Sequence, residues 1–159
     1  MQAAAPLSSP ESAGELSLNG GKYILFYDGV CVMCNDFIRS LTEEDTQDVF
    51  RFAPLQSRFA REVLARHGHD AGDMDSMYVV IDYGTPQERI VWKYTALTFA
   101  MSRLPGVKGW VGRLLARIPT SLGDKYYERQ ARTRYDEYGK YDACPVPRPD
   151  IRRRLLALE

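Results

Sequence analysis

The stretch ILFYDGVCVMCNDFIRSL, Ile24–Leu41, contains the change of pattern that decides the fold. It begins inside KYILFY, Lys22–Tyr27, whose β-branched and aromatic residues predict a buried strand. Asp28 and Gly29 then form a turn signal. After the turn, apolar residues recur three or four positions apart, at Cys31, Cys34, Phe37, Ile38 and Leu41. This spacing predicts an amphipathic helix to about residue 42, so the two cysteines fall where a strand gives way to a helix.

The rest of the chain alternates strands and helices. Further strands are predicted at 48–55, 76–82 and 88–93, the last two joined as a hairpin by a turn at 84–86. Helices are predicted at 57–68, 95–104, 109–118 and 123–139, with a short basic helix at the C-terminal end. The first two strands should be parallel because a helical crossover joins them. We therefore expect an α/β, thioredoxin-like three-layer fold, with a four-stranded mixed sheet, flanking helices and a C-terminal helical extension.

Composition and charge narrow the classes of function. The 159 residues are 45% hydrophobic and 26% charged, which is typical of one soluble globular domain. Basic and acidic residues number 21 each, so the chain lacks the basic excess that predicts nucleic-acid binding. No uninterrupted apolar run reaches the roughly 18 residues that a membrane span needs. We therefore expect neither a nucleic-acid partner nor an integral membrane segment.

The N-terminal residues and the cysteine count bear on location. Residues 1–20 are rich in Ala, Ser, Pro and Gly and are expected to form a flexible tail before a single domain over residues 21–159. They lack the basic segment and long apolar run of a secretory signal. Three cysteines, Cys31, Cys34 and Cys144, are too few for a secreted disulfide scaffold and odd in number. A reducing, cytoplasmic location is expected.

The position of the cysteine pair favours redox chemistry. Cys31 starts the helix, where free amides and the positive end of the dipole stabilise an anion such as a thiolate. In such positions the pKa of a cysteine falls from about 8.5 to roughly 3.5–7.5. Cys34 lies one turn further on, on the same face. We expect Cys31 to be the more exposed thiol and the nucleophile, and Cys34 to resolve the mixed disulfide.

Asp28 has two possible roles beside this pair. It can cap the helix by accepting an amide hydrogen bond near Cys31. It can also relay a proton, because a partly buried carboxylate has a raised pKa and can take the proton of Cys34. The two roles are compatible. An ionised Asp28 would oppose a thiolate at Cys31, so the carboxylate and the helix terminus shift the pKa of Cys31 in opposite directions.

Other interpretations of the cysteines remain open. The pair can be two buried packing residues, or part of a zinc site with Cys144 and with His67 or His69. Cys144 can be a third redox thiol or a packing residue, and we favour packing. A catalytically idle interaction domain on the same fold is a further alternative. The chain lacks the Gly-rich fingerprint of nicotinamide and flavin sites, so we expect no cofactor.

Two basic segments are interpreted by their surroundings. The arginines of the long C-terminal helix, Arg129, Arg132 and Arg134, are expected to form a solvated face. The segment GWVGRLLARI, residues 109–118, is amphipathic and basic. Core packing is the expected role of its apolar residues, and contact with a membrane surface is the alternative.

The stretch YDGVCVMC resembles the D-x-x-C-x-x-C signature of the DCC family of thiol-disulfide oxidoreductases, matched by Asp28, Cys31 and Cys34. FRFAPLQS, residues 50–57, and DSMYVVID, residues 75–82, resemble the family's second and third strands. The C-terminal pattern is matched at Asp124, Tyr127, Ala131, Arg134, Tyr135, Gly139 and Cys144. The resemblance, from about residue 22 to about 156, implies a thioredoxin-like fold and protein-disulfide reductase activity. The implied partners are a disulfide-containing protein or small thiol substrate and a thiol electron donor.

The chain departs from related patterns at two places. Tyr94-Thr95-Ala96 stands where the family often has Ser-Asp-Ala or Ser-Glu-Ala. The segment DMDSMYVVID, residues 73–82, has no proline, whereas thioredoxins place one before the third strand, facing the dithiol. Because that proline helps to form the substrate cleft and keeps metal off the cysteines, substrate docking is expected to differ in this chain.

Overall fold

A computed structural model describes residue 18 and residues 21–156, so nearly all of the predicted N-terminal tail lies outside the described residues. Four strands form one mixed sheet in the order β2-β1-β3-β4. Their bounds are β1 Tyr23–Tyr27, β2 Phe50–Pro54, β3 Tyr78–Ile81 and β4 Arg89–Trp92. β1 pairs in parallel with β2 and antiparallel with β3, and β3 pairs antiparallel with β4. The predicted α/β class, the mixed sheet and the hairpin formed by the last two strands, β3 and β4, are confirmed.

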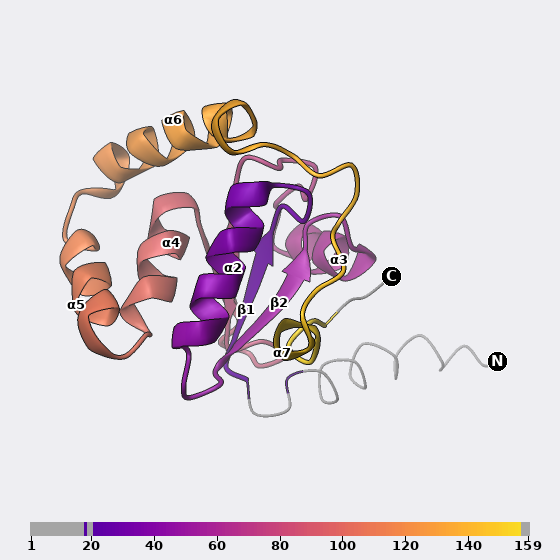
Figure 1. Ribbon diagram of the computed structural model, residues 1–159. Coiled ribbons are helices and arrows are strands. Elements are labelled where there is room, and N and C mark those ends of the chain that lie inside the picture. The colour runs from indigo at the N-terminus through magenta and orange to yellow at the C-terminus, as the bar shows by residue number, and fades with distance from the viewer. Residues whose placement is uncertain (1–17, 19–20, 157–159) are drawn as a thin grey trace.

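The helices are α2 Val32–Glu44, α3 Arg58–Arg66, α4 Lys93–Ser102, α5 Gly106–Leu115, α6 Thr120–Tyr138 and α7 Pro149–Arg152. α2 and α3 follow β1 and β2 as the sequence predicts. α4 begins at once after β4, earlier than the sequence pattern suggests, through Lys93 in the left-handed region at φ 56°. The predicted C-terminal helical extension is confirmed, with α5 and α6 both packed on α4 (Figure 1).

Helices cover both faces of the sheet, so the central strands are apolar on both sides. Leu25, Phe52 and Val79 face one way and pack with Ile38 and Leu41 of α2. Ile24, Phe26 and Val80 face the other way and pack with Val63 and Leu64 of α3. In Figure 1, α2 crosses in front of β1 and β2. This packing fixes the start of α2 above the carboxyl end of β1, where the cysteine pair lies.

The C-terminal segment returns to β2. The Phe52 amide donates to the Arg154 carbonyl at 3.0 Å, and the Leu156 amide donates to the Phe52 carbonyl at 2.9 Å. The Arg154 side chain is buried and pairs with Asp45 at 2.7 Å. Asp45 also accepts the amide of Phe50 at 3.0 Å. One buried ion pair therefore joins the end of α2, the start of β2 and the C-terminal segment.

This ion pair generates a stability prediction. Arg154→Met leaves the Asp45 carboxylate buried without its cation, so we expect the free energy of unfolding in urea to fall by about 3–5 kcal/mol. Arg153→Met is the matched control, because Arg153 is exposed and its pairing with Asp48 is worth less than about 1 kcal/mol. Equal losses in the two variants would contradict the structural role of Arg154.

Candidate active site

The two cysteines occupy the first turn of α2. Cys31 is the N-cap residue, with extended backbone angles, and its Sγ accepts the backbone N–H of Cys34 at 3.2 Å. Sulfur here takes the capping place that a side-chain oxygen usually fills. The predicted location of both thiols at the strand-to-helix junction is confirmed. A thiolate at Cys31 would face the unpaired amides of the helix start, the most favourable backbone position for an anion.

The pKa values of the two thiols are shifted in opposite directions. The pKa of Cys31 is lowered to about 7, first by a hydrogen bond from the Cys34 side chain, with further help from the Cys34 amide and the Arg134 cation against the opposing effect of burial. The pKa of Cys34 is strongly raised, first because that hydrogen bond holds its proton and then because partial burial disfavours its charged form. As the pH rises above about 7, the pair therefore comes to carry a single proton, held by Cys34, with the negative charge on Cys31.

The expectation that Cys31 is the more exposed thiol is wrong. Cys31 is fully buried, whereas Cys34 is partly exposed. The cover comes from the segment after α6, which pairs with the chain around Cys31. The Val32 amide donates to the Gly139 carbonyl at 3.3 Å, and the Tyr141 amide donates to the Val30 carbonyl at 2.7 Å. Sequence could not show this cover, because the covering residues are more than a hundred positions from the cysteine.

Asp28 is buried beneath the turn that leads to Cys31. Its Oδ1 accepts the Val30 amide at 3.2 Å and Gln56 Nε2 at 2.8 Å. Its Oδ2 accepts Arg134 Nη2 at 2.8 Å and the hydroxyl of Tyr135. Burial alone would raise the pKa of Asp28, but the hydrogen bonds from Tyr135 and Arg134, followed by those from Gln56 and Val30, outweigh it and hold the pKa below its usual value. Asp28 is therefore an ionised carboxylate with four donors.

Both roles expected for Asp28 need correction. The residue does accept an amide hydrogen bond beside Cys31, yet the cap of α2 is Cys31 itself. The raised pKa required of a proton relay is also absent, since the pKa is lowered. Asp28 instead fixes the turn before Cys31 and holds Arg134 next to the dithiol.

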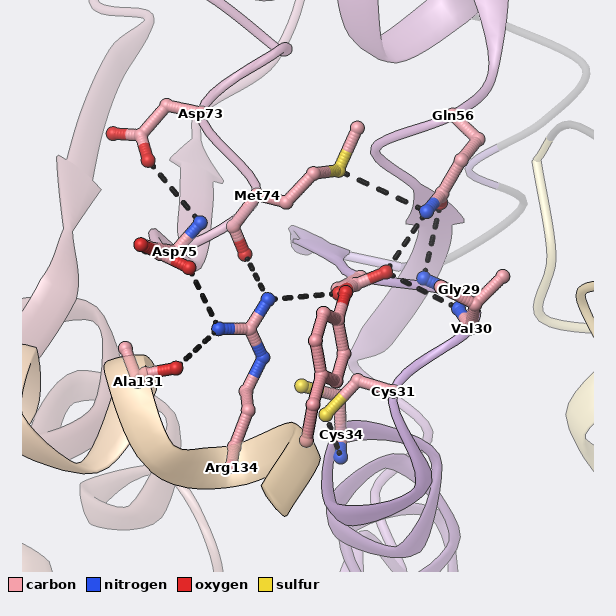
Figure 2. Close-up of polar contacts among 12 residues, drawn as sticks. Gly29, Val30, Cys31, Cys34, Gln56, Asp73, Met74, Asp75, Ala131 and Arg134 are labelled. Atoms are coloured by element: carbon pink, nitrogen blue, oxygen red, sulfur yellow. Dashed lines mark hydrogen bonds and ion pairs between the residues drawn. The ribbon is translucent and has the colours of Figure 1, made fainter. Parts of the chain in front are cut away.

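Arg134 is the residue that sequence reasoning placed wrongly, on a solvated face. Its side chain is only 4% exposed. Besides Asp28, the guanidinium binds Asp75 Oδ1 at 2.7 Å and the Met74 carbonyl at 2.8 Å, as Figure 2 shows. It also donates to the Ala131 carbonyl one turn earlier in α6. The match of Arg134 and Tyr135 to the C-terminal family pattern was the signal that could have identified both residues.

The same guanidinium holds the loop before β3. Arg134 contacts Asp75 and the Met74 carbonyl in this loop, and residues 73–77 contain no proline. Figure 2 shows Arg134 reaching from α6 between this loop and the turn that leads to Cys31. Gln56 is a second residue that the sequence did not indicate. Its side-chain oxygen accepts the Gly29 amide at 3.0 Å and so holds the turn that leads to Cys31.

An apolar cavity of about 290 Å³ opens beside Cys34. It lies among α2, α4, α6 and the loop before β3, and is lined chiefly by Met33, Phe37, Met74, Met77, Leu97 and Tyr127. Methionine side chains are flexible and polarizable, so such a wall adapts to ligands of differing shape. Cys34 lines this cavity and Cys31 does not.

Cys144 lies on the opposite side of the turn. A Cβ placed at Gly29 would be 2.5 Å from its sulfur, so the absence of a side chain at Gly29 makes room for this thiol. Partial burial, then the charge of Asp28, raises the pKa of Cys144. Cys144 is therefore a protonated thiol near neutral pH, close to the chain that carries Cys31. The residue is exposed, which argues against the favoured role as a buried packing residue.

The zinc alternative finds no support in the described part of the chain, where no group of three or more His, Cys, Asp or Glu side chains is placed to hold a metal ion. The two histidines have other contacts. His67 hydrogen-bonds to Glu88 at 2.6 Å, and His69 packs between the rings of Tyr78 and Trp92.

Comparison with known proteins agrees with this geometry. Residues 25–140 match the family model described as DCC1-like thiol-disulfide oxidoreductase, and the chain belongs to that family of enzymes. The chain is 30% identical to YuxK, an uncharacterized protein of Bacillus subtilis, over 84% of this chain and 93% of the relative. It is 28% identical to a chloroplastic DCC family protein of Arabidopsis thaliana, over 77% of this chain and 69% of the relative. No solved structure matches the chain.

None of the helices among the described residues is long and apolar enough to cross a membrane.

The shared proton generates a prediction about Cys31. Thiolate absorbance in the ultraviolet should titrate with a pKa of about 7 in the wild type, and the thiolate fraction should rise as pH rises through that value. Cys34→Ala removes the donor and should raise the pKa of Cys31 by at least one unit, toward the value of a free cysteine, about 8.5. Cys34→Ser is the matched control, because its hydroxyl can still donate. An unchanged pKa in Cys34→Ala would show that another group stabilises the thiolate.

Asp28 generates a prediction about pH and stability. Its folded pKa is depressed, so its contribution is fully present above its unfolded pKa of about 3.9 and is lost as pH falls toward the folded value. Asp28→Asn should lower the free energy of unfolding by about 3–5 kcal/mol near neutral pH, because Arg134 is left buried without this partner. Between about pH 6 and pH 3 the variant should lose less additional stability than the wild type. Urea unfolding across this range measures both effects.

Asp142→Asn serves as the control, since Asp142 is exposed. A wild-type pH profile no steeper than that of Asp28→Asn would contradict the depressed pKa.

Proposed function

We propose that this enzyme reduces disulfides in proteins or small molecules through a Cys31–Cys34 dithiol. The observation that carries the proposal is the position of Cys31 Sγ, which caps α2 and accepts the Cys34 amide at 3.2 Å. This position stabilises the thiolate, the form of cysteine that attacks disulfides. A pKa of about 7 also suits the reaction, because an attacking thiol works best when its pKa is close to the ambient pH.

The reaction follows in two exchange steps. The Cys31 thiolate attacks one sulfur of the substrate disulfide, the substrate S–S bond breaks, and the first substrate thiolate leaves and takes up a proton. Cys34 then loses its proton and attacks Cys31 Sγ, which releases the second substrate thiol. The products are two substrate thiols and a Cys31–Cys34 disulfide. An external thiol donor, such as glutathione or a thiol protein, returns two electrons to the pair; one of the two protons it gives up restores the Cys34 thiol and the other passes to solvent, so that Cys31 is again the thiolate.

Asp28 and Arg134 act as positioning residues in this scheme. Asp28 is held ionised by four donors, so it is poorly suited to take the proton of Cys34. The leaving substrate thiolate is the more suitable base, because it forms next to Cys34 when Cys31 is bound in the mixed disulfide. Arg134 supplies a cation that favours the thiolate at Cys31 and offsets the charge of Asp28.

Exposure and proton affinity point to different thiols as the nucleophile. Cys34 faces the cavity but holds its proton, whereas Cys31 is buried but ionises. We assign the nucleophile to Cys31, because a protonated thiol is unreactive toward disulfides whatever its exposure. A substrate then enters by the cavity beside Cys34, or the segment from Gly139 to Tyr141 moves aside to uncover Cys31.

The remaining expectations become part of this proposal. We propose that Cys144 is dispensable for the two exchange steps, since its raised pKa keeps it protonated. The cytoplasmic location that the cysteine count favours, where a thiol electron donor is abundant, stays a prediction.

An insulin-reduction assay with dithiothreitol tests the proposal. We expect the wild type to accelerate reduction, Cys31→Ser to fall to the uncatalysed rate, and Cys144→Ser to keep at least half of the activity. In a separate incubation with insulin and no dithiothreitol, which would cleave the adduct, Cys34→Ser should accumulate a mixed disulfide at Cys31, detectable by mass spectrometry, because the resolving thiol is missing.

Equal rates for the wild type and Cys31→Ser would reject the catalytic role and favour the idle interaction domain. A mixed disulfide found on Cys144 in place of Cys31 would show that Cys31 is not the nucleophile. Circular dichroism of each variant is the control that checks whether the serine variants remain folded.

A further inference from the structure

The apolar residues of α5 face away from the protein, contrary to the expected core packing. Val107 and Trp110 are 76% and 60% exposed, and Leu114 is also exposed. Their spacing of three and four residues places them on one stripe of the helix. Ile118, just beyond the helix, and Leu122 and Tyr126, in the first turns of α6, are exposed as well. Among the described residues, six of the nine exposed large hydrophobic side chains thus lie within residues 107–126.

The face of α5 that packs on the protein is formed by glycines. Gly109 and Gly112 are its buried residues. A Cβ at Gly112 would lie 2.6 Å from the Ser102 backbone nitrogen, and one at Gly109 would clash with the Leu104 carbonyl. α5 therefore approaches the end of α4 closely through its glycines and leaves its apolar stripe outward. Figure 1 shows α5 at the outer edge of the molecule, with α4 between it and α2.

Basic side chains flank the stripe. Residues 103–125 include Arg103, Lys108, Arg113, Arg117 and Lys125, and the one acid in this stretch is Asp124. The Asp124 carboxylate is turned toward the protein, where it accepts the Tyr94 amide at 3.2 Å. The chain as a whole has zero net charge, so this stretch is a local basic excess. Lys108 reaches Glu44 at 3.3 Å, while no partner is found among the described residues for Arg117 or Lys125.

We propose that α5 and the start of α6 bind the surface of a membrane that contains anionic lipids. An outward apolar stripe with a tryptophan, bordered by Lys and Arg, is the arrangement of helices that lie in the bilayer interface. The apolar side chains enter the headgroup boundary and the cations contact lipid phosphates. This inference is independent of the proposed redox function, because the α5 stripe of Val107, Trp110 and Leu114 takes no part in lining the cavity beside Cys34, although Tyr126 at the start of α6 does line it.

The charges argue against a second copy of the chain as the occupant. A symmetric interface would bring the same basic residues of two copies together, and like charges across an interface are unfavourable. An anionic bilayer can bury the apolar stripe and pair with the cations at the same time. Large exposed apolar patches on proteins usually mark a surface that binds a membrane or another protein.

Vesicle binding by the full chain tests the proposal. The chain has two tryptophans, and Trp92→Phe leaves Trp110 as the remaining one. The fluorescence emission of this variant therefore reports on the stripe. With vesicles of phosphatidylcholine and phosphatidylglycerol, we expect co-sedimentation and a blue shift of Trp110 emission, both weakened by salt. Pure phosphatidylcholine vesicles should bind much more weakly.

Two variants separate the contributions. Arg117→Gln with Lys125→Gln should weaken partitioning into the anionic vesicles about 30-fold, as expected for two basic residues near a charged surface. Trp110→Ser with Leu114→Ser should weaken it at least tenfold. The matched control is Arg58→Gln with Arg89→Gln, which removes two exposed arginines on α3 and β4 and should bind like the parent.

Several results would overturn the proposal. One is the absence of binding to anionic vesicles. Another is equal weakening in the arginine control, which would show that total charge and not this surface drives binding. A third is a concentration-dependent dimer, seen by sedimentation velocity and lost in Trp110→Ser with Leu114→Ser, which would assign the stripe to an interface between copies.

Discussion

The buried ion pair between Asp28 and Arg134 is the interaction on which the arrangement of the site depends. It joins the end of β1 to the C-terminal helix α6 at 2.8 Å, and the remaining donors of Arg134 fix the loop before β3. Three segments that are distant in sequence are thereby held around the first turn of α2. Buried charges are stable only when paired and hydrogen-bonded, so neither partner can be replaced alone without a large cost. α6 therefore contributes to the candidate site together with the end of β1 and the start of α2.

The ion pair also sets the electrostatics of the dithiol. An isolated Asp28 carboxylate would disfavour a thiolate at Cys31, three residues further along the chain, and Arg134 compensates for that charge. The proton shared between the sulfurs, the Cys34 amide and the start of α2 then supply the net stabilisation of the Cys31 thiolate. A fixed carboxylate beside a dithiol thus serves to position a cation. The same arrangement explains why a buried acid next to reactive cysteines need not be a proton acceptor.

The sequence predicted those features that depend on local pattern. The strand, turn and helix around Asp28, Cys31 and Cys34 follow from residue spacing, and the parallel pairing of β1 with β2 follows from the helical crossover between them. Apart from the helix cap, which is Cys31 and not Asp28, the errors concern contacts between distant segments. Arg134 and Asp28 are 106 residues apart, and helical periodicity cannot show which arginine of α6 turns inward. The cover over Cys31 and the outward stripe of α5 were missed for the same reason.

Equilibrium redox titration of the full-length protein in glutathione buffers, with the disulfides mapped by mass spectrometry, tests the central claim most directly. The account predicts one reversible two-electron transition in which a Cys31–Cys34 disulfide forms while Cys144 remains a free thiol. A transition that links Cys144 to Cys31 or Cys34, or the absence of any reversible disulfide between Cys31 and Cys34, would contradict it.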